Sequence, residues 1–132
     1  MIYVEFRGKK IDNDKWVYGY YNWCNLSGEH IIAINNDYDE DRVYYSFEKE
    51  AIFEKVVPKT VGQYTTLKDK NGIKIYVGDI LKGKGRMGVV KFKYGMFVID
   101  YGEEHIGDVP IYCLSDYYEK IGNIHDNPEL II

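Results

Sequence analysis

The acidic loop around His105 contains the residue types that acid–base catalysis or metal binding would need. His105 follows Glu103 and Glu104 and precedes Asp108. An imidazole beside carboxylates can relay protons or hold a metal ion. Together with Asp79, this loop would suit a hydrolase or a metal enzyme, which we keep as an alternative. No two histidines stand at a metal-pair spacing in the sequence, so we prefer a solvated surface histidine.

A second acidic cluster has the spacing of a calcium-binding loop. Asp37, Asp39, Asp41 and Glu48 take loop positions 1, 3, 5 and 12, where oxygen ligands would surround Ca²⁺. Arg42 replaces the glycine that the sharp turn needs, and the flanking sequences favour strands rather than helices. A solvated acidic turn is therefore the preferred interpretation, and we expect no bound metal.

The glycine-rich stretch 83–88, GKGRMG, matches phosphate-binding patterns only in its letters. A dinucleotide-binding loop must open a helix whose N-terminus faces the pyrophosphate. This stretch is followed instead by VVKFKY, which favours a strand. A kinase glycine-rich loop would be accompanied by HRD and DFG motifs, and the sequence contains neither. We therefore predict a flexible hairpin and no cofactor.

Basic residues concentrate in the segment 68–93, which holds eight Lys or Arg residues and two Asp residues. Lysines beside aromatic rings can bind nucleic acid, because ammonium groups contact phosphates while rings stack on bases. Lysines on strand edges also prevent edge-to-edge aggregation, and we prefer this interpretation. The candidate binding face consists of Lys82, Lys84, Arg86, Lys91, Lys93, Tyr76 and Tyr94.

Alternation of apolar and polar residues, rather than helical spacing, dominates the chain. Short runs rich in β-branched and aromatic residues are separated by glycine-rich turns, which predicts an all-β fold. The Asn71-Gly72 pair predicts a type I′ hairpin turn, because both positions accept positive φ. The closing DNPELII predicts one helical turn that begins at Pro128, with Asn127 or Asp126 as its cap.

We predict short antiparallel strands that form a barrel-like, SH3-like C-terminal part, residues 59–132, packed with an N-terminal β region, residues 1–58. The two parts can also form one intertwined unit. Of the 132 residues, 45% are apolar, which is enough for a hydrophobic core, and the net charge is −4. Cys24 and Cys113 form no CxxC pair, which argues against zinc and fits a reducing cytoplasm. No apolar run approaches the ~20 residues of a membrane-spanning helix, so we expect a soluble protein.

Three blocks of the sequence carry a family resemblance. They are EFRG followed by WVYG near the start, TVGQYTTLKDKNGIKIYVGDIL at residues 60–81, and EKIGNIHDNPEL near the end. In this order, and over nearly the whole chain, they resemble the YopX-like family of phage and prophage proteins. Two positions depart from the family pattern, which usually has glycine at Thr66 and glutamate at Val77.

The resemblance implies an all-β protein with a barrel-like C-terminal part that assembles as an oligomer, and it carries no catalytic residue to this chain. We also expect the protein to act in the host cytoplasm. The resemblance also identifies residues 61–81 as the family's hairpin. Asn71 and Gly72 would form its turn, Gly78 would permit a bend or bulge, and Asp79 would bind backbone amides at that bend.

From these observations we predict a binding or assembly module without enzymatic activity. The predicted partners are further copies of the chain and a phage or host protein. Basic residues 68–93 could pair with the acidic stretches 37–41 and 100–108 of another copy. The first alternative is a nucleic-acid-binding protein that uses the basic 68–93 face. The second is the enzyme built around His105, Asp108 and Asp79.

Overall fold

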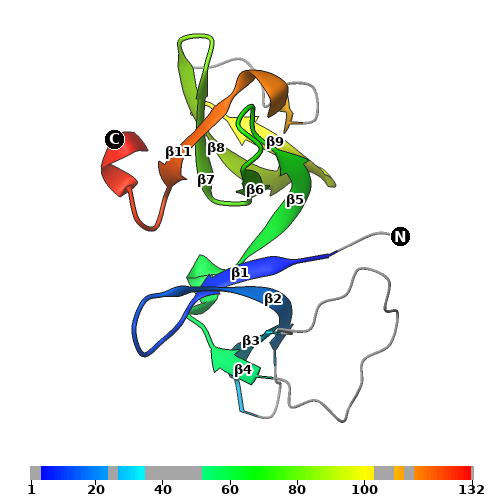
Figure 1. The fold of residues 1–132 in the computed structure, drawn as a ribbon, viewed down its shortest axis with the longest axis vertical. Helices are drawn as coiled ribbons and strands as arrows, with labels where there is room; N and C mark the ends of the chain where they lie inside the picture. Colours follow the sequence, from blue (N-terminus) through cyan, green and yellow to red (C-terminus); the bar gives the residue numbers. More distant parts are fainter. Residues whose placement is uncertain (1–3, 24–26, 35–51, 103–108, 112–114, 132) are drawn as a thin grey trace. The chain divides into compact units, whose positions relative to one another are not determined.

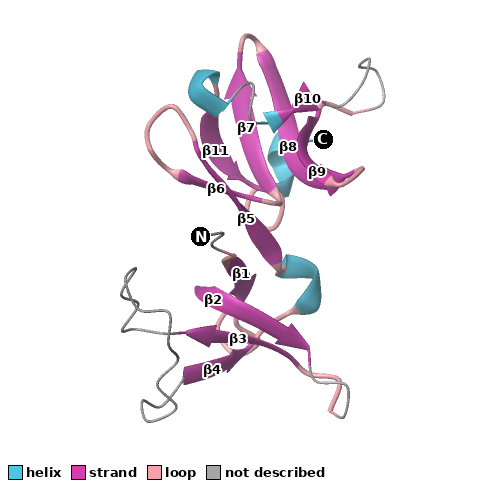
Figure 2. Cartoon of the chain, turned by 90° about the vertical axis from the view of Figure 1, so that its right-hand side faces the viewer, coloured by secondary structure: helices cyan, strands magenta, loops and turns pink. Residues whose placement is uncertain are grey.

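Strands joined by short turns make up most of the computed structural model, as Figures 1 and 2 show. The structure describes residues 4–23, 27–34, 52–102, 109–111 and 115–131. Two units are present, the N-terminal unit Val4–Val61 and the C-terminal unit Gly62–Ile132. The predicted all-β class is confirmed, with antiparallel pairing throughout the described strand pairs. In the part of the chain that is described, the sheets remain open and do not close into a barrel.

The N-terminal unit contains an antiparallel sheet with the strand order β4-β3-β2-β1. Among the described residues of this unit, Ile32 and Val56 have buried apolar side chains. Gly19 lies where β2 passes β3 closely, because an added Cβ would stand 2.1 Å from the carbonyl oxygen of Ala33. The elements are β1 (Phe6–Lys9), β2 (Trp16–Trp23), β3 (His30–Ile34), β4 (Ile52–Lys55) and the 3-10 helix η1 (Pro58–Thr60).

The C-terminal unit contains a five-stranded antiparallel sheet with the order β10-β9-β8-β7-β11, and β5 pairs with β6. One face of the sheet packs on the hydrophobic core, in which Leu81 of β7, Val90 of β8 and Ile99 of β9 are fully buried. The strands are β5 (Gly62–Lys68), β6 (Lys74–Tyr76), β7 (Asp79–Gly83), β8 (Arg86–Lys93), β9 (Met96–Asp100), β10 (Val109–Pro110) and β11 (Glu119–Asn123). The 3-10 helices are η3 (Ser115–Tyr117) and η4 (Pro128–Ile131).

The C-terminal helical turn begins at Pro128, as predicted, and is a 3-10 helix. The backbone N–H of Leu130 donates to the carbonyl oxygen of Asn127 over 3.1 Å. The side-chain amide oxygen of Asn127 accepts the backbone N–H of Asn123 over 3.2 Å. Asn127 therefore connects this turn to the end of β11.

Two tight turns join β7, β8 and β9. Lys84 and Gly85 have φ angles of 52° and 74°, and they separate the paired residues Gly83 and Arg86. The second turn has the same form, with φ angles of 55° at Tyr94 and 76° at Gly95. Positive φ at both central residues of a two-residue loop characterises the type I′ hairpin turn. The glycine-rich stretch is thus a hairpin, as predicted.

The Asn71-Gly72 pair forms a different turn from the predicted type I′. Only Gly72 has a positive φ, at 80°. Its N–H donates to the carbonyl oxygen of Asp69 over 3.0 Å, and the N–H of Asp69 donates to the carbonyl oxygen of Ile73 over 2.8 Å. The result is a three-residue loop in which a type I turn precedes a left-handed glycine. The carboxylate of Asp69 favours this geometry, because it accepts the N–H groups of Asn71 and Ile73.

An irregularity in β5 places Thr66 in a strained backbone conformation. The pairing of β5 with β6 shifts between Tyr64 and Lys68, and Thr66 lies inside that shift with a φ of 69°. Left-handed backbone is costly for a β-branched residue and free of steric cost for glycine. Glycine at this position would therefore remove backbone strain at the bulge.

Candidate binding surface

Asp79, a member of the alternative enzyme site, is fully buried. The contacts of its carboxylate are with the fold itself. Its Oδ2 accepts the backbone N–H of Tyr76 over 2.7 Å, which agrees with its predicted contact to a backbone amide. The same oxygen lies 3.1 Å from Nζ of Lys120 on β11. Gly78, with a φ of 98°, bends the chain between β6 and β7 immediately before it. His105 and Asp108 lie outside the described residues.

Asp69 is a structural residue that the sequence reasoning missed, and it is nearly as deeply buried as Asp79. In addition to the two N–H groups of its own loop, it accepts the backbone N–H of Lys120 over 2.9 Å. Burial alone would raise the pKa of Asp69, but the N–H donors of Lys120, Ile73 and Asn71 outweigh it and lower the pKa. Asp is favoured at the first position of a type I turn. The sequence DKNG at residues 69–72 could therefore have indicated the role of Asp69.

Metal binding finds no support in the part of the chain that the structure describes, where no group of three or more His, Cys, Asp or Glu side chains could hold an ion. The calcium-loop positions at 37–41 and Glu48 lie outside the described residues, as do Glu103, Glu104, Cys24 and Cys113.

The candidate basic face is divided between the two ends of β8. Lys82, Lys84 and Arg86 lie around the β7–β8 turn, whereas Lys91 and Lys93 lie near the β8–β9 turn. Eight residues of strand separate these turns, a span of roughly 25 Å. Tyr76 contributes to neither group, because it is buried on β6 with 3% of its surface exposed. Two of the three cations at the first end lie over aromatic rings, Lys84 over Tyr117 and Arg86 over Tyr101.

At the other end of β8, two lysines converge on one carboxylate. Oδ2 of Asp100 lies 2.8 Å from Nζ of Lys91 and 3.0 Å from Nζ of Lys93, and its Oδ1 accepts the N–H of Gly102 over 2.8 Å. The hydrogen bond from Lys91, followed by those from Gly102 and Lys93, holds the pKa of Asp100 far below its usual range. The carboxylate stays charged at neutral pH and orients both ammonium groups.

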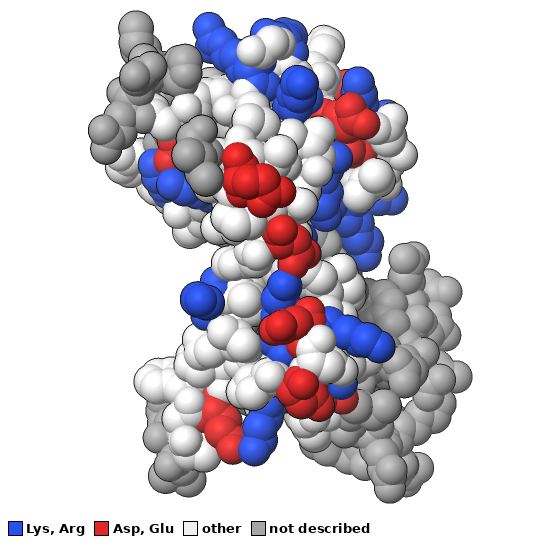
Figure 3. All heavy atoms as spheres, turned by 90° about the vertical axis from the view of Figure 1, so that its left-hand side faces the viewer, with Lys and Arg blue, Asp and Glu red and all other residues white. Residues whose placement is uncertain are grey.

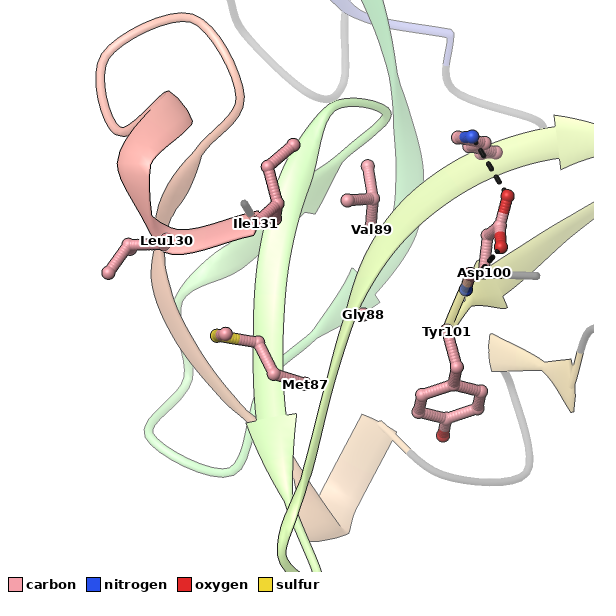
Figure 4. A pocket seen from close by; sticks show the side chains of 9 residues that line it. Met87, Gly88, Val89, Asp100, Tyr101, Leu130 and Ile131 are labelled. Atoms are coloured by element: carbon pink, nitrogen blue, oxygen red, sulfur yellow. Dashed lines mark hydrogen bonds and ion pairs between the residues drawn. The ribbon is translucent and has the colours of Figure 1, made fainter. Parts of the chain in front are cut away.

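The Lys91–Asp100 pair borders a partly open trough of about 320 Å³. Strand register places Val89 opposite Asp100 and Lys91 opposite Val98, so these four residues share one face, which we call the Lys91 face. Figure 4 shows Val89 and Asp100 projecting to one side of the strands and Tyr101 to the other. The trough is lined by Met87, Gly88, Val89, Lys91, Asp100, Tyr101, Gly102, Leu130 and Ile131.

The β8–β9 tip, residues 92–96, exposes three large apolar side chains. Phe92 is 57% exposed, Met96 43% and Tyr94 85%. The ring of Phe92 contacts Phe97 edge-to-face, with centroids 5.2 Å apart. Tyr94 occupies a left-handed position that Asn, Asp or Gly fill at lower cost in type I′ turns. The tip therefore combines backbone strain with exposed apolar surface.

Comparison with protein families gives the assignment. A family model described as YopX protein matches residues 5–132, nearly the whole chain. The chain belongs to the YopX family. The resemblance carried by residues 60–81 and by the two outer blocks is thereby confirmed. No curated protein matches the sequence.

A solved structure has a similar fold to this YopX family member. It is the crystal structure of protein EF1440 from Enterococcus faecalis, at 21% sequence identity and a TM-score of 0.54, with 100% of each chain covered. At this identity the likeness supports the all-β fold and carries no information on activity. Among the described residues, no helix has the length and apolar character needed to cross a membrane.

On the face drawn in Figure 3, the charge of the described residues is mixed rather than continuous. In Figure 3, Lys and Arg side chains of the C-terminal unit lie among Asp and Glu side chains. The Lys91–Asp100–Lys93 group has the same character, because an acid lies between two bases. Surfaces of alternating sign suit protein partners better than they suit a nucleic-acid backbone, which attracts an uninterrupted basic strip.

Proposed function

We propose that this YopX family member is a phage or prophage binding module without enzymatic activity, which acts in the host cytoplasm through its β8–β9 tip. The observation that carries the proposal is Tyr94, an 85% exposed aromatic ring on a strained turn. A residue that is unfavourable for its own backbone and buries little surface contributes little to folding. Strain of this kind concentrates at functional sites, and exposed aromatic side chains often anchor protein interfaces.

The nucleic-acid alternative has weaker support from the same residues. The ammonium groups of Lys91 and Lys93 both lie beside the carboxylate of Asp100, which offsets part of their positive charge. A polyanion would also meet the net charge of −4 of the whole chain. We therefore place a protein partner first, and we expect no nucleic-acid affinity tighter than about 10⁻⁴ to 10⁻⁶ M at physiological salt.

Site-specific photocrosslinking in bacterial host cells tests the proposal. A photoreactive phenylalanine analogue replaces Tyr94, and in a control chain it replaces Lys70, which is exposed in the β5–β6 loop of the same unit. We expect a discrete adduct at position 94 that the control position does not give and that protease, but not nuclease, removes. A nuclease-sensitive adduct would favour the nucleic-acid alternative. Equal yields at both positions would contradict the proposal.

Self-association is a second part of the proposed function. Exposed apolar side chains occur in both units, including Phe53 at 61% and Phe92 at 57%, and each can contact another copy. We expect light scattering at micromolar concentrations to give a mass above the 15.5 kDa of one chain. A mass of one chain at every concentration would remove the assembly role and leave the binding role.

A further inference from the structure

The outer edge of β4 carries backbone groups that point away from its own sheet. β4 is the last strand of the N-terminal sheet and pairs with β3, as Figure 2 shows. The N–H of Val56, just after β4, donates to the carbonyl oxygen of His30 over 2.9 Å. Bonded and non-bonded residue pairs alternate along an antiparallel ladder, so the N–H and C=O of Phe53 point away from β3. Among the described residues, no group binds them.

The end of the same edge is covered by the chain itself. The N–H of Ile11 donates to the carbonyl oxygen of Lys55 over 3.1 Å, and Lys10 forms an isolated bridge with Val56. A strand added to β4 therefore cannot extend beyond Lys55. The open stretch is short and includes Phe53, whose side chain is 61% exposed.

Sheet edges in the C-terminal unit carry groups that block pairing. In β6 the N–H of Tyr76 donates to Oδ2 of Asp79 over 2.7 Å. In β11 the N–H of Lys120 donates to Oδ2 of Asp69 over 2.9 Å. The edge strand β10 contains Pro110, which has no N–H to donate. Proteins block edges in such ways because an open edge pairs with other chains. The unblocked part of β4 is therefore a candidate for pairing.

A second copy of the chain complements this edge about a two-fold axis. When two β4 strands run antiparallel with Phe53 opposite itself, each N–H of Phe53 donates to the C=O of the other. A shift of register toward Lys55 would need the carbonyl group that Ile11 already occupies. The two exposed rings then lie on one face, where cross-strand aromatic pairs are favourable. A flexible peptide would gain the same few bonds and lose more conformational freedom, because β4 is already extended.

Charge on β4 does not oppose the pairing of two copies. Nζ of Lys55 lies 2.8 Å from Oε1 of Glu29, and Oε2 of Glu54 lies 3.5 Å from Nζ of Lys10. A lysine on an edge strand disfavours pairing through its charge, but Lys55 has a carboxylate of its own chain beside it. Each charged side chain of β4 is thus offset within its own copy, which reduces repulsion between the two strands.

Resting on the proposed self-association, we propose that two copies pair through their β4 edges, antiparallel and with Phe53 at the two-fold axis. The sheets of the two N-terminal units then form one continuous sheet with the order β1-β2-β3-β4-β4-β3-β2-β1. The interface uses no residue of the β8–β9 tip, so the two proposed roles can be tested separately.

Two substitutions at position 53 test this pairing in a light-scattering dilution series. Phe53→Pro removes the ring and the outward N–H, which no described group of the chain accepts, so the fold should be retained. It should raise the dimer dissociation constant at least about tenfold, because two hydrogen bonds are lost per dimer. Phe53→Ser removes the ring alone and should have a smaller effect. Tyr117→Ser, at a ring 59% exposed in the C-terminal unit, is the matched control and should change nothing. Circular dichroism checks that each variant is folded.

Amide hydrogen exchange provides a second measurement, which needs no variant. The N–H of Phe53 should exchange slowly in the paired protein, and faster once dilution separates the copies, because it then meets water. The N–H of Gly85, in the turn between β7 and β8, is the control. It should exchange fast in both states.

Each result decides for or against edge pairing. An oligomer whose mass is unchanged in Phe53→Pro, or a Phe53 N–H that exchanges fast in the oligomer, would overturn it. Self-association through another surface and the binding role would then stand, because the mass and the Tyr94 adduct test them independently. A mass of one chain at every concentration would overturn edge pairing together with self-association. If Phe53→Pro leaves the mass unchanged and abolishes the Tyr94 adduct, β4 binds a strand of the partner protein, and the pairing of copies is also overturned.

Discussion

The β5–β6 loop and the β8–β9 tip are both hairpin turns of the C-terminal unit that contain glycine. They differ in how well their residues suit the backbone conformation. In the β5–β6 loop the left-handed position is filled by Gly72, and Asp69 accepts three backbone N–H groups around it. In the β8–β9 tip a left-handed position is filled by Tyr94, whose ring is exposed. The first turn has residues that suit its backbone. The second retains a residue that its backbone disfavours, which is expected where binding rather than stability selects the side chain.

The largest effect should come from removing the carboxylate of the stable loop. Asp69→Ala leaves the N–H groups of Asn71, Ile73 and Lys120 without their acceptor in a largely buried setting. We expect the free energy of unfolding to fall by about 3 kcal/mol, since each unsatisfied buried group costs roughly 1–3 kcal/mol and water reaches part of this loop. Urea denaturation measures the change. Asp12→Ala, at a side chain 72% exposed, is the control and should stay within about 0.5 kcal/mol of wild type.

A smaller change in the free energy of unfolding, of opposite sign, should follow from relieving the backbone strain in β5, the strand that leads into this loop. Thr66→Gly removes a β-branched side chain from a φ of 69°. We expect a gain of about 1 kcal/mol, because the strain relieved exceeds the added freedom of the unfolded chain. Lys68→Gly, at a strand position without positive φ, should instead destabilise the fold. A loss of stability in Thr66→Gly would mean that the bulge is not strained.

A substitution in the β8–β9 tip should change the free energy of unfolding less than the two above. Stability and binding should change in opposite directions. Tyr94→Asn places a residue that favours left-handed backbone at the first position of the turn. We expect the free energy of unfolding to rise by about 0.5 kcal/mol, while binding through the tip is lost. Thermal unfolding and the photocrosslinked partner, once isolated, provide the two measurements. If Tyr94→Asn lowered both together, the ring would be structural and the contrast between the two turns would disappear.

The smallest expected effect is on the pH dependence of stability. The pKa of Asp69 is lowered in the folded chain from a reference value of 3.8. The ionised carboxylate of Asp69 therefore stabilises the fold at pH values above its pKa in the unfolded chain. This stabilisation is lost as the pH falls through its pKa in the folded chain. We expect the free energy of unfolding to decline below about pH 4, and less steeply in Asp69→Asn. Urea denaturation between about pH 2 and pH 6 measures both slopes; equal slopes would show that Asp69 contributes nothing to this dependence.

Sequence patterns were sufficient for the class of fold because strand periodicity is local. Alternating residues in β8 and β9 specify which side chains face the core, and this needs no knowledge of partners. Gly78 and the glycine-rich stretch were placed at turns for the same reason, since positive φ is a local requirement. The C-terminal turn from Pro128 was equally readable, because Pro fits the first helical position wherever the helix lies.

Turn type and the candidate site depended on tertiary structure. A two-residue loop at Tyr94-Gly95 follows from the pairing of Lys93 with Met96, and strand register is a property of two strands rather than of one turn. The Asn71-Gly72 loop took another form because the carboxylate of Asp69 binds its backbone.

The sequence by itself determined the strands, the glycine turns and the YopX resemblance, all of which rest on residues close together in the chain or on their order. Only the folded C-terminal unit decided that Asp100 meets Lys91 and Lys93, that Asp69 reaches the backbone of Lys120, and that Tyr76 is buried. The physical reason is that hydrogen bonding and burial depend on distances in space. Those distances are set by how β5, β8, β9 and β11 pair and pack, which no local pattern specifies.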